Sequence, residues 1–73
     1  MTRFFRVDDL SGAFRYVFRD RRTEDGDFLE RYDPATRTWV KAPPTVMSYL
    51  YNGEIGATEI TEIEADALRA AAT

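Results

Sequence analysis

The stretch AFRYVFR, residues 13–19, decides the fold of this chain of 73 residues. Large aromatic residues alternate in it with a second set, Phe14, Tyr16 and Phe18 against Arg15, Val17 and Arg19. A period of two residues is typical of a β-strand whose two sides meet different surroundings. It predicts a strand that packs its aromatic side against helices and directs Arg15, Val17 and Arg19 away from them.

The segments on either side of this strand predict an antiparallel meander of three to four strands. Residues 2–7 (TRFFRV) form the first strand, and Gly12 supplies the positive φ angle that the connecting turn needs. Residues 27–32 (DFLERY) and 38–41 (TWVK) form the third and fourth strands. Residues 19–27 (RDRRTEDGD) are expected to form a charged loop before them.

The chain changes character at Pro43 and Pro44, because consecutive prolines cannot donate hydrogen bonds in a sheet and usually end a strand. Residues 45–51 (TVMSYLY) have apolar residues four positions apart, which favours a short helix with Asn52 and Gly53 as its C-terminal cap. The alternative is a hairpin that turns at Asn52 and Gly53, since Asn-Gly is a strong hairpin signal. We favour the helix because the proline entry and the glycine exit agree with it.

The clearest predicted element is a helix over residues 62–71. Thr61 and Glu64 have the spacing of a capping box, and acidic residues crowd the first turn, where the helix dipole favours them. Asp66 and Arg69 are three residues apart and can pair on the helix surface. These signals define both the start of the helix and its polar side.

The buried side of this helix determines how it packs. We expect it to bury Ile63, Ala67, Leu68 or a nearby stripe, and residues 59–60 could approach the sheet edge first. The elements together predict a single small α+β domain over residues 1–73. In this domain an antiparallel β-meander of three to four strands is followed by two short helices packed on one face.

Composition excludes several functional classes. The hydrophobic fraction of 44% is that of a folded chain, and the absence of cysteine and histidine excludes a disulfide framework and thiolate or imidazole metal sites. We therefore expect no bound metal or cofactor, and homo-oligomerisation is the support still available to so small a core. No segment resembles a membrane span or a signal peptide, so we expect a soluble, cytoplasmic protein.

Charge is unevenly distributed along the chain, although the net charge is only −3. Residues 1–41 hold nine basic residues against eight acidic ones, whereas residues 42–73 hold Arg69 against five acidic residues. The overall acidity argues against a surface that binds polyanions as a whole. The asymmetry directs attention to the arginines of the first half.

Side chains that could carry catalysis are few. Ser11 and Ser48 lie in no recognisable triad or elbow motif. The carboxylates occur in pairs in a predicted turn, loop and helix start: Asp8 and Asp9, Asp25 and Asp27, Glu62 and Glu64. Turn capping, solvation and helix-dipole stabilisation account for these pairs without a catalytic role. We therefore predict no catalytic residues and no enzyme activity.

The second face of the sheet is the informative feature, because two short helices should cover only one face. Its neighbours depend on register, with Phe4 and Arg6 or Arg3 and Phe5 from the first strand, and Leu29 and Arg31 or Phe28 and Tyr32 from the third. In each register arginine and apolar or aromatic residues lie together. The candidate partner-binding residues are Arg6, Arg15, Val17, Arg19, Arg31, Arg37 and Trp39.

Three interpretations of this face compete. It could be a solvated sheet back, a protein interface, in which arginine and aromatic residues are enriched, or a surface whose aromatic rings stack on unpaired bases. We expect a non-catalytic interaction module that binds a protein partner or itself through this face. Single-stranded nucleic-acid binding is the alternative, and a small carboxylate-based enzyme is the least favoured function.

Arg37 lies near the end of the turn DPATRTW, residues 33–39, at a position where a hairpin often needs a positive φ angle. Asp33 can accept backbone hydrogens across this turn, and Pro34 presets the φ angle of its second residue. A left-handed arginine costs about 1 kcal/mol, so it could be retained for binding, tolerated without use, or avoided by another loop geometry. We favour tolerance or another geometry.

Overall fold

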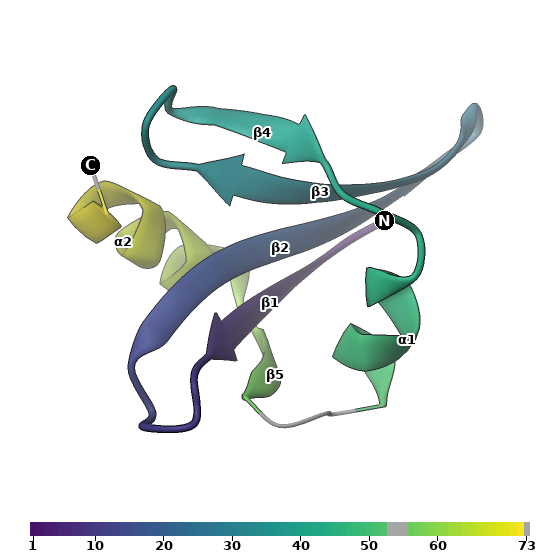
Figure 1. The fold of residues 1–73 in the computed structure, drawn as a ribbon. Coiled ribbons are helices and arrows are strands. Elements are labelled where there is room, and N and C mark those ends of the chain that lie inside the picture. The colour runs from purple at the N-terminus through teal and green to yellow at the C-terminus, as the bar shows by residue number, and fades with distance from the viewer. Residues whose placement is uncertain (53–55, 73) are drawn as a thin grey trace.

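The computed structural model describes residues 1–52 and 56–72 of the chain. These residues form one five-stranded antiparallel sheet and two helices (Figure 1). The elements in chain order are β1 (Thr2–Asp8), β2 (Phe14–Thr23), β3 (Gly26–Asp33), β4 (Thr38–Lys41), α1 (Val46–Tyr51), β5 (Ala57–Ile60) and α2 (Glu62–Ala72). The strand order β4-β3-β2-β1-β5 confirms the α+β fold and the meander of the first four strands.

β2 is longer than the sequence pattern indicated, since it continues through residues 19–23. These charged residues are stable in a strand because residues of opposite charge face them from β3, with Arg19 opposite Glu30 and Arg22 opposite Asp27. The predicted charged loop over residues 19–27 is therefore wrong. The connection from β2 to β3 is instead a tight turn.

A fifth strand completes the sheet where only an approach to its edge was expected. β5 pairs with β1, beginning with Phe4 opposite Ile60. The Asp8 amide donates a 2.8 Å hydrogen bond to the Gly56 carbonyl at the other end of this ladder. A Cβ atom on Gly56 would lie 2.0 Å from the carbonyl oxygen of Asp8, so only glycine permits this approach.

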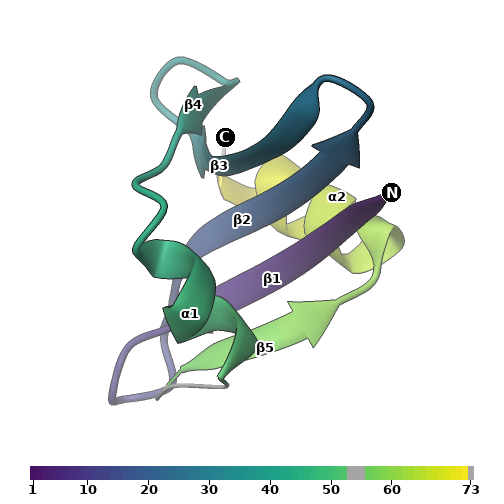
Figure 2. The ribbon, with the colours of Figure 1, turned by 90° about the vertical axis from the view of Figure 1, so that its right-hand side faces the viewer.

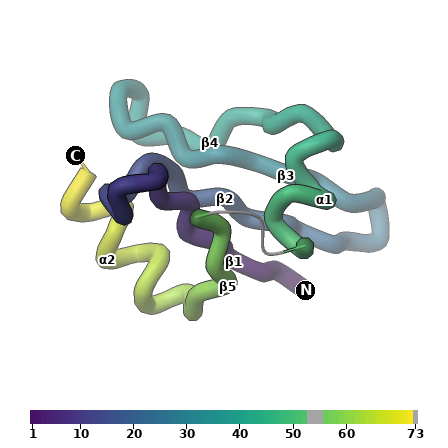
Figure 3. Tube along the Cα trace, turned by 60° about the horizontal axis from the view of Figure 1, so that its bottom comes forward, coloured from purple at the N-terminus to yellow at the C-terminus, as the bar shows by residue number. Residues whose placement is uncertain are grey.

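The two helices cover opposite faces of the sheet, and the expectation that both pack on one face is wrong. Figure 2 shows α1 in front of the sheet and α2 behind it, and in Figure 3 the strands run between the two helices. The physical reason is that both faces carry large apolar side chains, Phe5 on one and Phe4 on the other, each within a buried cluster. We call the two sides the α1 face and the α2 face.

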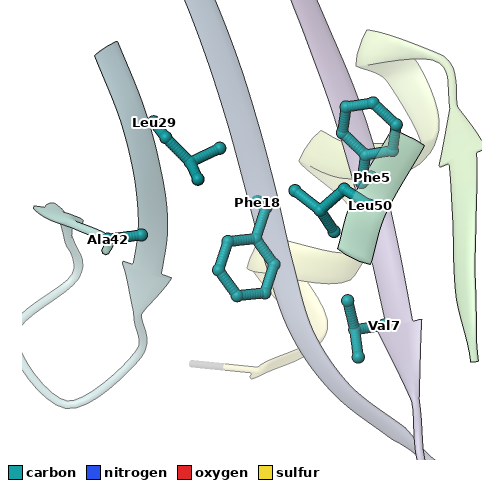
Figure 4. Close-up of a cluster of buried hydrophobic side chains, with 6 residues drawn as sticks. All are labelled: Phe5, Val7, Phe18, Leu29, Ala42 and Leu50. Atoms are coloured by element: carbon teal, nitrogen blue, oxygen red, sulfur yellow. The ribbon is translucent and has the colours of Figure 1, made fainter. Parts of the chain in front are cut away.

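The α1 face holds the larger buried cluster, drawn in Figure 4. Its members come from β1, β2, β3, α1 and the segment after β4: Phe5, Val7, Phe18, Leu29, Ala42 and Leu50. Leu50 of α1 reaches the sheet between Phe5 and Phe18 (Figure 4). The Tyr51 ring meets the Phe5 ring edge-on, with 5.1 Å between centroids. One short helix thus packs on this face through Leu50 and Tyr51, and its Val46, Met47 and Tyr49 also pack against the cluster.

The same helix decides between the two interpretations of residues 45–51. α1 spans Val46–Tyr51, which confirms the helix and excludes the hairpin. Its C-terminal cap is Asn52, at a right-handed φ angle of −81°, and the predicted contribution of Gly53 lies outside the described residues. The prolines lead into the helix as expected, because the amides of Val46 and Met47 donate 3.1 Å hydrogen bonds to the carbonyls of the two prolines.

The α2 face holds a second buried cluster, formed by Phe4, Val17, Tyr32 and Ala65. Ala65 of α2 is completely buried and Leu68 packs against the cluster, whereas Ile63 is 82% exposed. The predicted stripe is therefore correct for Leu68 and wrong for Ile63 and for Ala67, which is exposed. The small side chain of Ala65 lets the helix approach the sheet closely, and this contact sets its rotation.

The first turn of α2 confirms the predicted capping box. The Glu64 amide donates to Thr61 Oγ1 at 3.1 Å, and the Thr61 amide donates to Glu64 Oε1 at 3.2 Å. Arg69 Nη1 and Asp66 Oδ1 are 3.0 Å apart, as their spacing predicted. The local signals were sufficient here because they act within one helix.

A β-bulge at the start of β2 divides its aromatic residues between the two faces. Tyr16 lies opposite Val7 but Phe14 lies opposite Asp8, so Arg15 is the extra residue. Phe14 therefore packs against the α2-face cluster. Tyr16 remains on the α1 face beside Phe18, with 6.2 Å between ring centroids. The prediction of one shared face is correct for Tyr16 and Phe18 and wrong for Phe14.

Candidate interaction surface

Part of the α2 face lies beyond the helix, on the outer half of the β2–β3 hairpin and the neighbouring β4. The strand register places Arg19, Glu30 and Lys41 in one row across β2, β3 and β4, and Arg21 opposite Phe28 in the next row. Phe28 is 40% exposed, so an aromatic ring lies at the surface among these charged residues. We call Arg19, Arg21, Phe28, Glu30 and Lys41 the arginine strip.

Glu30 is the centre of the strip. Its Oε1 accepts hydrogen bonds from the Nε atoms of both Arg19 and Arg21 at 2.7 Å, and Arg21 Nη2 lies 3.3 Å from Oε2. These bonds hold the pKa of Glu30 below its ordinary value, and the bond from Arg21 contributes most. One carboxylate thus organises two guanidinium groups, and two positive charges remain when Lys41 is included.

The guanidinium groups of the strip lie over aromatic rings. Arg19 Cζ is 4.3 Å from the centroid of Trp39, and Arg21 Cζ is 5.1 Å from that of Phe28. Trp39 receives Arg69 of α2 as well, at 5.3 Å. Stacking and ion pairing together fix the planar arginines before any partner arrives, which lowers the conformational entropy lost on binding.

A groove of about 400 Å³ borders the strip where β4 ends. Phe28, Glu30 and Lys41 line it from the strip, together with Asp27. The apolar side chains at its base and far wall are Leu29, Ala42, Pro44 and Met47. An apolar side chain of a partner could therefore enter beside the charged residues.

Only two of the seven predicted partner-binding residues lie at or beside the strip, namely Arg19 and Trp39. Val17 is 2% exposed beneath α2, so it is a core residue and cannot contact a partner. Arg31 lies on the α1 face with its Cζ 5.1 Å from the Tyr16 ring. The second helix covers the row of Val17, and the strand register, with Arg31 opposite Phe18, places Arg31 on the α1 face.

The other three predicted residues lie elsewhere. Arg6 is on the α2 face but its Nε pairs with Asp8 at 2.7 Å, and Arg15 is at the bulge, 3.0 Å from Asp9. Arg37 is at the tip of the β3–β4 turn with a φ angle of 58°. This confirms the left-handed conformation, so the alternative loop geometry is excluded. The structure does not bring these three side chains together with the strip.

Sequence reasoning missed Arg21, Phe28, Glu30 and Lys41. Arg21 fell in the segment expected to be a loop, and the open register left the face of Phe28 undecided. A usable signal was present, because Arg19 and Glu30 lie at equal distances along the chain from the turn residues Glu24 and Asp25. Opposite charges at such positions favour a continuous hairpin.

The α1 face contains a buried polar pair of a different kind. Asp20 is 1% exposed, and its Oδ2 accepts hydrogen bonds from the Tyr51 hydroxyl and, at 3.1 Å, from Arg22 Nε. Burial and the bond to Asp20 raise the pKa of Tyr51. The pair joins α1 to β2, so we assign it a structural role.

The carboxylates considered for catalysis lie in separate surroundings. Asp8 pairs with Arg6, and Asp9 Oδ1 accepts hydrogen bonds from the Ser11 hydroxyl and from the Ser11 and Ala13 amides. These bonds lower the pKa of Asp9, and the bond from the Ser11 hydroxyl contributes most. The remaining four are exposed: Asp25, Asp27, Glu62 and Glu64.

Across residues 1–52 and 56–72, no three carboxylates lie close enough together to hold a metal ion. Neither helix in this part of the chain is long and apolar enough to cross a membrane. No protein-family model, curated protein or solved structure matches the chain. Its function is therefore argued from the geometry of the arginine strip.

Proposed function

We propose that the chain is a non-catalytic interaction module that binds a protein, either another chain or a second copy of itself, through the arginine strip. The observation that carries the proposal is the stacked pair of arginines around Glu30. Arginine and aromatic residues dominate the binding energy of protein interfaces. Here they are held in place by 2.7 Å hydrogen bonds to one carboxylate, with unneutralised positive charge beside them.

The chemistry of the strip favours a partner surface that carries carboxylates next to an apolar side chain. Lys41 makes no ion pair with any residue that the structure describes. Glu24 and Asp25 occupy the turn beyond Arg21 and Phe28, so the positive charge is confined to the middle of the hairpin. A carboxylate of the partner would have to lie over that middle.

Stacked arginines weigh against the nucleic-acid alternative. Binding of single strands uses open aromatic faces on which bases stack. In this chain guanidinium groups lie over Trp39 and Phe28 beside the strip, and over Tyr16 on the other face. On the strip, a base would have to displace Arg19 or Arg21, which are also hydrogen-bonded to Glu30.

The test is retention of proteins from an extract of the source cells by immobilised wild type, Lys41→Glu and Arg31→Glu chains. We expect the proteins retained by the wild type to be lost with Lys41→Glu and kept with Arg31→Glu, which changes the same charge on the α1 face. Identical retention by all three chains would contradict the proposal. Salt-sensitive binding of a mixed single-stranded oligonucleotide that Lys41→Glu abolishes would favour the alternative instead.

A further inference from the structure

The first turn of α2 has the chemistry that the arginine strip lacks. It carries Glu62 and Glu64, with the 82% exposed Ile63 between them. Neither carboxylate forms an ion pair with another described residue, although Glu64 bonds to Thr61. The turn therefore presents two carboxylates beside an apolar side chain. We call Glu62, Ile63 and Glu64 the acidic turn.

The acidic turn and the strip lie on the same face of one molecule. α2 begins two residues after Ile60, which lies opposite Phe4, and Phe4 lies opposite Arg19. Ile60 and Arg19 are thus two strand spacings apart, about 10 Å. The two surfaces are neighbours on the α2 face, and no ion pair joins them within the molecule.

We infer that the strip binds a second copy of this chain, with the acidic turn of each copy on the strip of the other. The inference rests on the proposed function, because it names the partner of that same surface. In a two-fold dimer, residue i of one copy contacts residue j of the other and j contacts i. Two complementary surfaces side by side on one face can therefore form two equivalent contacts in a closed dimer. Neither surface is then left free to bind a third copy.

The pairing follows from charge and shape. Glu62 and Glu64 would neutralise the charge that Arg21 and Lys41 leave over, and Ile63 would cover the exposed ring of Phe28 and the mouth of the 400 Å³ groove. The same contacts place carboxylates over the middle of the hairpin, away from Glu24 and Asp25. Charge complementarity of this kind fixes orientation and partner choice more than affinity.

The dimer is expected to be weak. A standard interface covers about 800 Å² of each partner, which would be about a sixth of the 4922 Å² surface of this chain. Exposed ion pairs contribute little individually. We expect a dissociation constant on the order of micromolar or weaker that rises with salt.

The experiment measures the solution mass over a wide concentration range at low salt, by analytical ultracentrifugation. Arg21→Glu alone and Glu62→Arg alone should each raise the dissociation constant by roughly tenfold or more. An equimolar mixture of the two variants should restore the wild-type value, because each reversed strip then meets the oppositely charged turn. Lys41→Glu is a second strip variant that leaves the bonds of Glu30 intact, and Arg31→Glu is the control on the α1 face.

Three outcomes would overturn the inference: a wild type that stays monomeric at every concentration, a mixture that associates no better than its components, or an equal loss with Arg31→Glu. A monomeric wild type that still retains cellular proteins through Lys41 would overturn the second copy as partner while supporting the interaction module. A monomer that retains nothing would overturn both. The two proposals are therefore tested separately.

Discussion

The two faces of the sheet both carry large apolar side chains, and different residues cover them on each face. On the α1 face Leu50 packs over Phe5 and Phe18, and Asp20 is buried and hydrogen-bonded to Tyr51. On the α2 face, the helix α2 covers Val17 but does not reach Arg19. There the Arg19 guanidinium group lies over the Trp39 ring instead. Under the proposed function, the α1 face serves stability and the open part of the α2 face serves binding.

The largest expected effect tests this contrast with one truncation on each face. Phe5→Ala removes a ring that is 2% exposed and should cost about 3–5 kcal/mol of unfolding free energy. Phe28→Ala removes the same atoms from a ring that is 40% exposed, and should cost about 1 kcal/mol or less because the site opens to water. Urea denaturation followed by circular dichroism measures both. Similar losses would show that the strip is a core in its own right.

A smaller effect is expected from the buried pair of the α1 face. Tyr51→Phe leaves the Asp20 carboxylate buried without one donor and should cost about 1–3 kcal/mol. The folded-state pKa of Tyr51 is raised, so its contribution is complete below the ordinary tyrosine pKa of about 10. It is lost as the pH rises through the folded-state pKa, because the unfolded chain releases the proton more easily.

The measurement for Tyr51 is the difference in unfolding free energy between wild type and Tyr51→Phe across alkaline pH. The difference should be constant near neutrality and shrink above about pH 10. Tyr49→Phe is the control for the general effect of tyrosine ionisation. A difference that grows with pH would reverse the sign of the argument.

The corresponding test on the strip concerns Glu30. Glu30→Gln removes the carboxylate between Arg19 and Arg21 and should cost about 1 kcal/mol at neutral pH, as for partly exposed ion pairs. The pKa of Glu30 is lowered in the folded chain, so its stabilisation is present above the ordinary value of about 4.3 and is lost as the pH falls through the folded-state pKa.

Asp27→Asn, on the same strand but exposed, is the matched control for Glu30→Gln. We expect its unfolding free energy to stay within about 0.5 kcal/mol of the wild type. Denaturant unfolding between neutral and acidic pH measures both variants. An effect of Asp27→Asn as large as that of Glu30→Gln would mean that net charge matters here and the specific pairing does not.

Arg37 gives the smallest expected effect; it lies at the β3–β4 turn, where it lines a pocket with Tyr32 and with Asp66 and Arg69 of α2. Its φ angle of 58° is strained for arginine, so Arg37→Gly should leave stability unchanged or raise it by up to about 1 kcal/mol. Self-association should not change. A variant that loses association would show that the arginine is retained for binding. The interaction surface would then include the β3–β4 turn.

Local signals in the sequence predicted the elements well. The alternation in residues 13–19 identified the middle of β2, and the capping box of Thr61 and Glu64 defined the start of α2. Proline entry into residues 45–51 was enough to favour α1. In each case the stabilising interaction joins residues a few positions apart, so the pattern and its cause lie in the same stretch.

Contacts between distant segments were not predictable in the same way. The bulge that moves Phe14 to the α2 face lies beside the join of Asp8 and Gly56, and Gly56 is distant in sequence. The cover over Val17 comes from Ala65, whose small side chain gave no sign of burial. The position of the candidate site was unpredictable for the same reason. In the row of Arg15, Val17 and Arg19, Val17 is covered by α2, which comes from the other end of the chain.

The most direct test of the contrast between the faces is a series of ¹H–¹⁵N spectra of the chain from dilute to concentrated solution. We predict concentration-dependent shifts at Arg19, Arg21, Phe28 and Lys41 and at Glu62, Ile63 and Glu64, which fade when salt is added. The amides of α1 should keep their positions throughout. Shifts centred on α1 and Tyr16 would contradict the account, and no shifts at any concentration would contradict the second copy as partner.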